Sequence, residues 1–170
     1  LDFLSNYKNE SYKKIYQYYK RFSSVSYIAL FAALKSDFKY DYALIKKILH
    51  DQYVNNNFYL LIDLGELEVN GQINSNLYED KECWIYIRYY YLKALLELGL
   101  YNKAREVVDN CDNQFNLLNI NSNITFEYQY LLADLDHLTN YFQNAISFSQ
   151  ALLKKSSTID QKIKCQYLYA

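Results

Sequence analysis

The chain has 170 residues and a net charge of −1 at pH 7, with acidic and basic residues interspersed along it. This balance excludes the strongly basic surface with which proteins grip a phosphate backbone, so we expect no direct nucleic-acid contact from this segment. Proline is absent and only three glycines occur. Because these residues interrupt helices most strongly, the composition predicts an all-α fold. No apolar run approaches the ~18 residues of a membrane span, which predicts no membrane partner.

Apolar residues recur at helical spacing along almost the whole chain. The spacing predicts helices at Ser11–Phe22, Val25–Lys35, Asp41–Asn55, Phe58–Asn70, Asp80–Leu98, Asn102–Asn113, Ile124–Leu138, Tyr141–Lys155 and Ile159–Ala170. No linker rich in Pro, Gly or Ser interrupts this series, so we expect a single helical-repeat domain over residues 1–170. The sequence starts at Leu1 and contains no methionine, and we expect it to be a segment of a longer protein.

Residues that tolerate a left-handed backbone stand at the predicted helix ends. Gly71 and Gly99 follow the fourth and fifth predicted helices, and Asn55–Asn57 follows the third. Glycine adopts this conformation without steric cost, and asparagine adopts it more readily than most residues. Thr158 and Gln161 have the spacing of a capping box at the start of the last helix. These residues predict where each helix stops or begins.

Two stretches of the chain have nearly the same sequence pattern, which we call the hairpin phrase: Tyr91–Ala104 and Leu132–Ala145. Each predicts a helix, a tight break and a second helix entered through an aromatic residue and then alanine, whose small side chain lets two helices approach closely. A third copy is Ala33–Ala43. Its final alanine, Ala43, lies 61 residues before Ala104, whereas Ala104 and Ala145 are 41 apart. The sequence therefore predicts a degenerate array of helical hairpins, a solenoid whose surface binds a partner.

The residues that could carry chemistry give no catalytic arrangement. No Ser, His and Asp stand in a nucleophile motif, there is no glycine-rich phosphate loop, and Glu66 and Glu68 lie two apart on a helix, too far around it to cooperate. We expect no enzyme and no cofactor. Asp134, Asp136 and His137 invite a metal site, but the side chain of Asp136 points away from the other two, so no metal is expected.

Other chemistry-bearing residues have structural interpretations. Cys83, Cys111 and Cys165 are odd in number and widely spaced, which favours reduced, buried thiols and a cytoplasmic protein. His50 stands alone near a helix C-terminus, where a cation suits the helix dipole. Trp84 begins a stripe that we expect in the core, made of Trp84, Ile87, Tyr91, Leu95 and Leu98.

The hairpin phrase resembles the tetratricopeptide repeat, in which Gly, an aromatic residue and Ala follow the first helix. Gly99, Tyr101 and Ala104 occupy those places, and so do Phe142 and Ala145. The chain departs from the repeat at several positions. Arg88 and Gln129 stand where the repeat prefers tryptophan, and Leu92 and Asn140 stand where it prefers glycine. No proline closes a unit. The resemblance implies a tetratricopeptide-like geometry in an irregular array.

The order of elements also resembles the peptide-sensing regulators of Gram-positive bacteria and their phages. These are the Rap, NprR, PlcR and Rgg group, and especially the arbitrium receptors. The segments that carry the likeness are Leu67–Ile73, Tyr86–Ala94 and Ser147–Leu152. The resemblance implies a cytosolic quorum-sensing receptor that binds a short linear peptide and regulates transcription through dimerisation or an attached DNA-binding domain. The matching helix-turn-helix is not found in Leu1–Phe22.

In tetratricopeptide geometry the first helix of each pair lines the concave face. On the fifth and seventh predicted helices the candidate groove residues are Tyr86, Tyr89, Lys93, Leu96, Glu127, Tyr130, Asp134 and His137. Tyrosines bury apolar side chains at low entropic cost, and Lys93 and Asp134 can each meet a charged peptide terminus. The alternative interpretation is an ordinary solvated face.

We therefore expect a peptide or protein segment as the partner, with a homodimer as the signalling assembly. Two alternatives stay open: a constitutive tetratricopeptide-like protein scaffold and, more remotely, a helical regulatory domain attached to an enzyme.

Overall fold

The computed structural model describes residues 10–15, 17–18, 26–35, 42–73, 81–111 and 123–168, and every regular element in these ranges is an α-helix. Residues 10–15 and 17–18 are helical. The labelled helices are α2 (Ser26–Leu34), α3 (Tyr42–Val54), α4 (Phe58–Val69), α5 (Lys81–Glu97), α6 (Tyr101–Cys111), α7 (Asn123–Leu138), α8 (Phe142–Lys155) and α9 (Ile159–Tyr167). The prediction of an all-α fold is confirmed, and the predicted ends of α3, α4, α5, α7 and α8 agree to within one residue.

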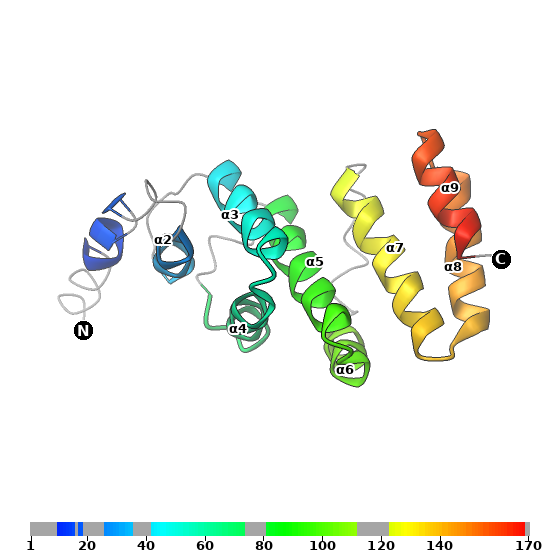
Figure 1. Ribbon diagram of the computed structural model, residues 1–170, viewed down its shortest axis with the longest axis horizontal. Helices are drawn as coiled ribbons and strands as arrows, with labels where there is room; N and C mark the ends of the chain where they lie inside the picture. Colours follow the sequence, from blue (N-terminus) through cyan, green and yellow to red (C-terminus); the bar gives the residue numbers. More distant parts are fainter. Residues whose placement is uncertain are drawn as a thin grey trace. The chain divides into compact units, whose positions relative to one another are not determined.

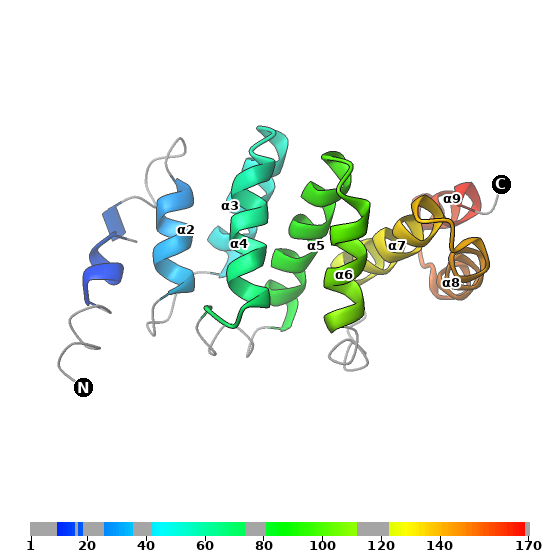
Figure 2. The ribbon, with the colours of Figure 1, turned by 90° about the horizontal axis from the view of Figure 1, so that it is seen from below.

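The chain divides into two compact units, Leu1–Tyr91 and Leu92–Ala170, and the division falls inside α5. In the first unit α2 packs against α3, and α3 packs against α4 (Figure 2). In the second unit α6 packs against α7, α7 forms a hairpin with α8, and α9 packs against α8 (Figure 1). The expectation of one continuous repeat domain stays a prediction.

Four helices end with the same backbone cap. At the end of α5, the N–H of Leu100 donates to the carbonyl of Leu95 over 2.8 Å and that of Gly99 donates to Leu96 over 2.9 Å. This is the Schellman pattern, and it requires a positive φ, here at the second residue after the last helical one. That residue is Asn56 in α3, Gly71 in α4, Gly99 in α5 and Asn140 in α7, with φ between 58° and 69°. The predicted roles of Gly71, Gly99 and the Asn55–Asn57 stretch are confirmed.

The predicted capping box at α9 is only half formed. Thr158 accepts a hydrogen bond from the N–H of Gln161 over 3.2 Å, as expected. The side chain of Gln161, however, reaches the N–H of Ser157 over 3.0 Å, one residue before the cap. The extended backbone of Thr158 brings Ser157 into reach, so the N–H groups of Gln161 and Ser157 each have a side-chain acceptor.

Small residues let neighbouring helices pack closely. Ala104 and Ala145, the alanines of the repeated phrase, are fully buried. Gly65 of α4 faces the ring of Tyr91 on α5, and a Cβ at that position would lie 2.1 Å from Cγ of Tyr91. The Tyr91 hydroxyl donates to Glu66 over 2.7 Å. A glycine inside a helix costs stability, but here only glycine leaves room for the ring.

A buried ion pair joins α4 to α5. Glu68 and Arg88 are 2% and 3% exposed. Two nitrogens of the Arg88 guanidinium, Nε and Nη2, contact the two carboxylate oxygens of Glu68. Trp84 donates its indole N–H to the same carboxylate over 2.8 Å, and the guanidinium lies 5.7 Å from the Trp84 ring centroid. Trp84 therefore lies in the core, as predicted. Arg88 stands at a position where the tetratricopeptide repeat prefers tryptophan, and in this chain the position carries the cation of the buried pair.

Candidate functional site

Three candidate groove residues share one face of α7. Glu127, Tyr130 and Asp134 are each half-buried and stand three and then four residues apart, the spacing that places side chains along one side of a helix. We call Glu127, Tyr130 and Asp134 the α7 face. The Tyr130 ring stacks on Phe126 with 6.5 Å between centroids and packs against the buried Cys165 and Leu152. The core thus holds Tyr130 in place while leaving part of its ring exposed.

Lys164 of α9 covers one end of the α7 face. Its Nζ donates to the two carboxylate oxygens of Glu127 over 2.6 and 2.8 Å. The same ammonium lies 5.7 Å from the Tyr130 ring centroid. Glu127 therefore has a cationic partner that also contacts the aromatic ring next to it. Lys164 was not among the predicted site residues, because the pairing of α9 with α7 has no signal in the local sequence.

The opposite end of the α7 face carries a carboxylate with a different environment. Burial raises the pKa of Asp134, and nearby His137 opposes that shift. Asp134 makes no hydrogen bond and no ion pair with the residues that the structure describes. Burial also raises the pKa of Tyr130, with a further contribution from the charge of Asp134. The α7 face therefore has one carboxylate that is paired with a cation, Glu127, and one that is poorly solvated, Asp134.

Lys93 of α5 lies within the electrostatic reach of the α7 face. Burial lowers the pKa of Lys93, whereas the carboxylates of Glu97 and Glu127 oppose the shift. Leu96, one turn further along α5, is half-buried. His137 differs from the other candidates, because it is exposed and its ring meets that of Phe142 on α8 at 5.5 Å between centroids. His137 thus borders the α7–α8 turn.

Tyr86 and Tyr89 belong to an aromatic cluster in the first unit. We call His50, Tyr53, Tyr86, Tyr89 and Tyr90 the tyrosine cluster. Tyr90 lies at its centre, with ring centroids 5.1 Å from Tyr89, 5.8 Å from Tyr53 and 6.4 Å from Tyr86. Because the eight candidates fall on two units, the prediction that they line one groove stays a prediction.

His50 has a partner that the sequence did not indicate. Its Nδ1 is 2.9 Å from the Tyr90 hydroxyl on α5, so the interpretation as a lone cation near a helix end was incomplete. Burial raises the pKa of Tyr90 to about 12, and the charges of Tyr86 and Asp51 contribute. The phenol is therefore neutral at physiological pH and able to share a hydrogen bond with the imidazole.

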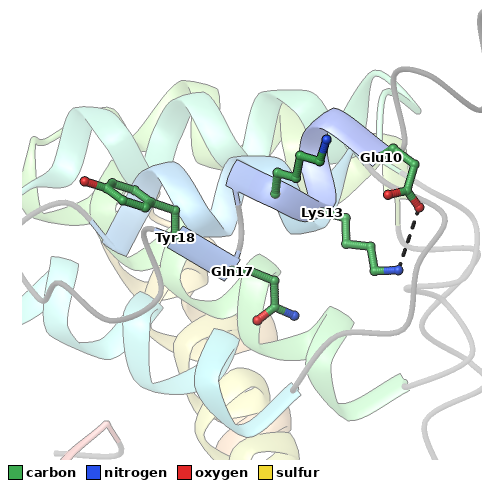
Figure 3. Close-up of a pocket in the computed structure, with 5 residues that line it drawn as sticks. Glu10, Lys13, Gln17 and Tyr18 are labelled. Atoms are coloured by element: carbon green, nitrogen blue, oxygen red, sulfur yellow. Dashed lines mark ion pairs between the residues drawn. The ribbon is translucent and has the colours of Figure 1, made fainter.

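Two shallow hollows lie elsewhere. One, of about 340 Å³, is lined at the helix turns of the second unit by Tyr101, Asn102, Arg105, Leu138, Thr139, Asn140 and Tyr141. There Arg105 binds Asp136, donates to Thr139 over 2.9 Å and lies 4.9 Å from the Tyr141 ring. The other, of about 390 Å³, is lined by five exposed residues: Glu10, Lys13, Lys14, Gln17 and Tyr18 (Figure 3).

The described residues contain no group of three or more His, Cys, Asp or Glu side chains that could hold a metal ion. Asp136, which stands between Asp134 and His137 in the sequence, binds Arg105. Glu66 and Glu68 both accept hydrogen bonds from α5, Glu66 from Tyr91 and Glu68 from Trp84 and Arg88. Cys83 and Cys165 are buried and form no disulfide, as predicted, while the side chain of Cys111 lies outside the described residues.

The chain matches no protein-family model, no curated protein and no solved structure. Among the described residues, no helix combines the length and the apolar character needed to cross a membrane. The class of protein therefore rests on the helical-hairpin fold and on the chemistry of the α7 face and the tyrosine cluster.

Proposed function

We propose that this chain is the sensing domain of a cytosolic receptor that binds a short linear peptide on the first helices of its hairpins. The observation that carries the proposal is the α7 face, where Glu127, Tyr130 and Asp134 are half-buried beside Lys93 and Lys164. A peptide offers apolar side chains, main-chain amides and charged ends, and this mixture of an anchored ring with charges of both signs matches those groups.

The tyrosine cluster supports the same function in the first unit. Tyr86 and Tyr89 are half-buried, and Lys46 lies 5.2 Å from the Tyr86 ring while donating to Glu82 over 2.7 Å. Tyrosines that are fixed by their neighbours lose little entropy when a ligand covers them. We propose that peptide binding favours one arrangement of the hairpins, and that the response passes to a dimer interface or to an attached DNA-binding domain.

Affinity selection tests peptide binding. Immobilised protein is exposed to pooled short peptides of random sequence, and the retained peptides are identified and measured by calorimetry. We expect Tyr130→Leu to weaken binding by about tenfold or more, since a central aromatic anchor contributes over 1.4 kcal/mol. Tyr101→Leu, a change of the same kind at an exposed tyrosine of α6, should leave the affinity unchanged. Retention of no peptide by the folded wild-type protein would overturn the proposal.

A constitutive protein scaffold is the second candidate, and one observation favours it. Ile159, Ile163 and Tyr167 form a row along one side of α9 and are 76%, 57% and 81% exposed. Exposed apolar rows of this kind are typical of protein contacts. A scaffold predicts a stable complex with one partner from the source cell that Ile163→Asp abolishes and Tyr130→Leu preserves. A receptor predicts the reverse dependence for its peptide.

A further inference from the structure

Four ion pairs between different helices follow one pattern. In the four pairs Glu82–Lys46, Glu68–Arg88, Asp136–Arg105 and Glu127–Lys164, the cation binds the carboxylate and also lies near an aromatic ring. The rings are those of Tyr86, Trp84, Tyr141 and Tyr130, at 5.2, 5.7, 4.9 and 5.7 Å from the cation. A cation at such distances gains from both the carboxylate and the ring.

The α7 face has a carboxylate on either side of one aromatic ring. Tyr130 stands three residues after Glu127 and four before Asp134, so a carboxylate flanks its ring on either side along the helix. On the Glu127 side, Lys164 completes the arrangement. On the Asp134 side, the carboxylate makes no hydrogen bond and no ion pair with the described residues, while the ring that it shares already lies beside Lys164.

Resting on the proposed function, we infer that the ligand supplies the missing cation, so that an ammonium or guanidinium group of the peptide docks between Asp134 and the ring of Tyr130. A half-buried carboxylate that makes no hydrogen bond and no ion pair is poorly solvated, and a cation brought by the ligand would supply that interaction. Burial that raises the pKa of Asp134 is consistent with this environment. His137, on the same helix, is exposed, and its ring meets that of Phe142.

The chemistry has two sources in a peptide: a free amino terminus or a lysine or arginine side chain. Small probes separate them in the intact protein. The ¹³C resonance of the Asp134 carboxylate, assigned with Asp134→Asn, is followed while N-acetyl-arginine amide, its neutral isostere N-acetyl-citrulline amide, glycinamide or N-acetyl-glycinamide is added.

We expect a saturable shift with at least one cationic probe and none with its neutral counterpart. A larger response to the arginine probe assigns the site to a side chain, and a larger response to glycinamide assigns it to an amino terminus. Exposed Asp109 on α6 serves as the internal control and should not respond. Equal responses to charged and neutral probes would overturn the inference.

The peptide selection then distinguishes this inference from the proposed function. Peptides retained by the wild-type protein should favour a cationic group by about tenfold, and Asp134→Asn should abolish that preference while Asp109→Asn keeps it. If peptides bind without a cationic preference, or if Asp134→Asn retains it, the inference fails and the receptor stands. If the cationic probes bind at Asp134 but no peptide is retained, the receptor fails and the cation site stands.

Discussion

The Glu68–Arg88 pair in the first unit and the Glu127–Lys164 pair in the second are built from the same parts but differ in burial. Glu68 and Arg88 are 2% and 3% exposed, whereas Glu127 and Lys164 are 23% and 43% exposed. Removing two charges from water is expensive, so the first pair depends on its geometry and on Trp84. The second pair remains solvated and contributes little to folding. The comparison separates a pair that fixes how two helices pack from one that shapes a surface.

Breaking the buried pair should have the largest effect. Arg88→Met leaves Glu68 buried without its counter-ion, and we expect a loss of about 3–5 kcal/mol in the free energy of unfolding. Urea unfolding measures it, with the fluorescence of Trp84, the only tryptophan of the chain, as a reporter beside the pair.

The double variant Glu68→Met with Arg88→Met is the control, because replacing both charges by apolar groups removes the unpaired charge. It should recover most of the lost stability. A double variant as unstable as the single one would show that packing, and not the ion pair, is responsible.

Filling the space beside Tyr91 should have the next largest effect. In Gly65→Ala the new Cβ would lie 2.1 Å from Cγ of Tyr91, so α4 and α5 must shift. We expect a loss of about 1–3 kcal/mol, the usual cost of overpacking. If the clash is the cause, the combined cost of Gly65→Ala and Tyr91→Ala will be smaller than the sum of the two single losses. Strict additivity in chemical unfolding would contradict it.

Removing the solvated cation should have a much smaller effect. Lys164→Met should cost about 0.2–1 kcal/mol, because the exposed pair with Glu127 is screened by water. The loss should shrink as salt is added. Lys162→Met, on an exposed position of the same helix, is the matched control and should change the free energy of unfolding less. A loss comparable to that of Arg88→Met would mean that burial does not distinguish the two pairs.

The substitution with the smallest expected effect, Asp134→Asn, should raise the free energy of unfolding instead of lowering it. Because burial raises the pKa of Asp134, the folded chain binds the proton more tightly than the unfolded chain does, and ionisation of Asp134 disfavours folding. Asp134→Asn should therefore stabilise the fold at neutral pH by about 0.5 kcal/mol or less, given its partial exposure.

The gain from Asp134→Asn should vanish as the pH falls below the ordinary pKa of aspartate, where both states carry the neutral acid. Thermal unfolding at neutral and acidic pH measures this, with Asp109→Asn as the control that should show no such dependence. A loss of stability at neutral pH would mean that the carboxylate of Asp134 has a stabilising partner.

The helices could be predicted from the sequence because their signals are local. Apolar spacing fixed α7 and α8 to within one residue, and the glycines at positions 71 and 99 marked two helix ends. Each of these signals depends on residues within a few positions of one another, and no long-range contact is needed to interpret it.

The partners of the charged side chains could not be predicted. Lys164 lies 37 residues from Glu127, and Arg105 lies 31 from Asp136. Their pairing depends on which helices pack together. That packing involves residues far apart in the sequence, and the spacing of apolar residues within one helix does not specify it. Gly65 is a local signal of one such contact, since a glycine inside a helix often marks the close approach of another group. Its neighbour proved to be the ring of Tyr91.

The cap shared by α3, α4, α5 and α7 bears on how such a chain can change during evolution. Each of these helices ends in the same two hydrogen bonds and one left-handed residue, whatever the length of the helix before it. Whole turns can therefore be added to or removed from a helix without altering the way that the chain reverses after it.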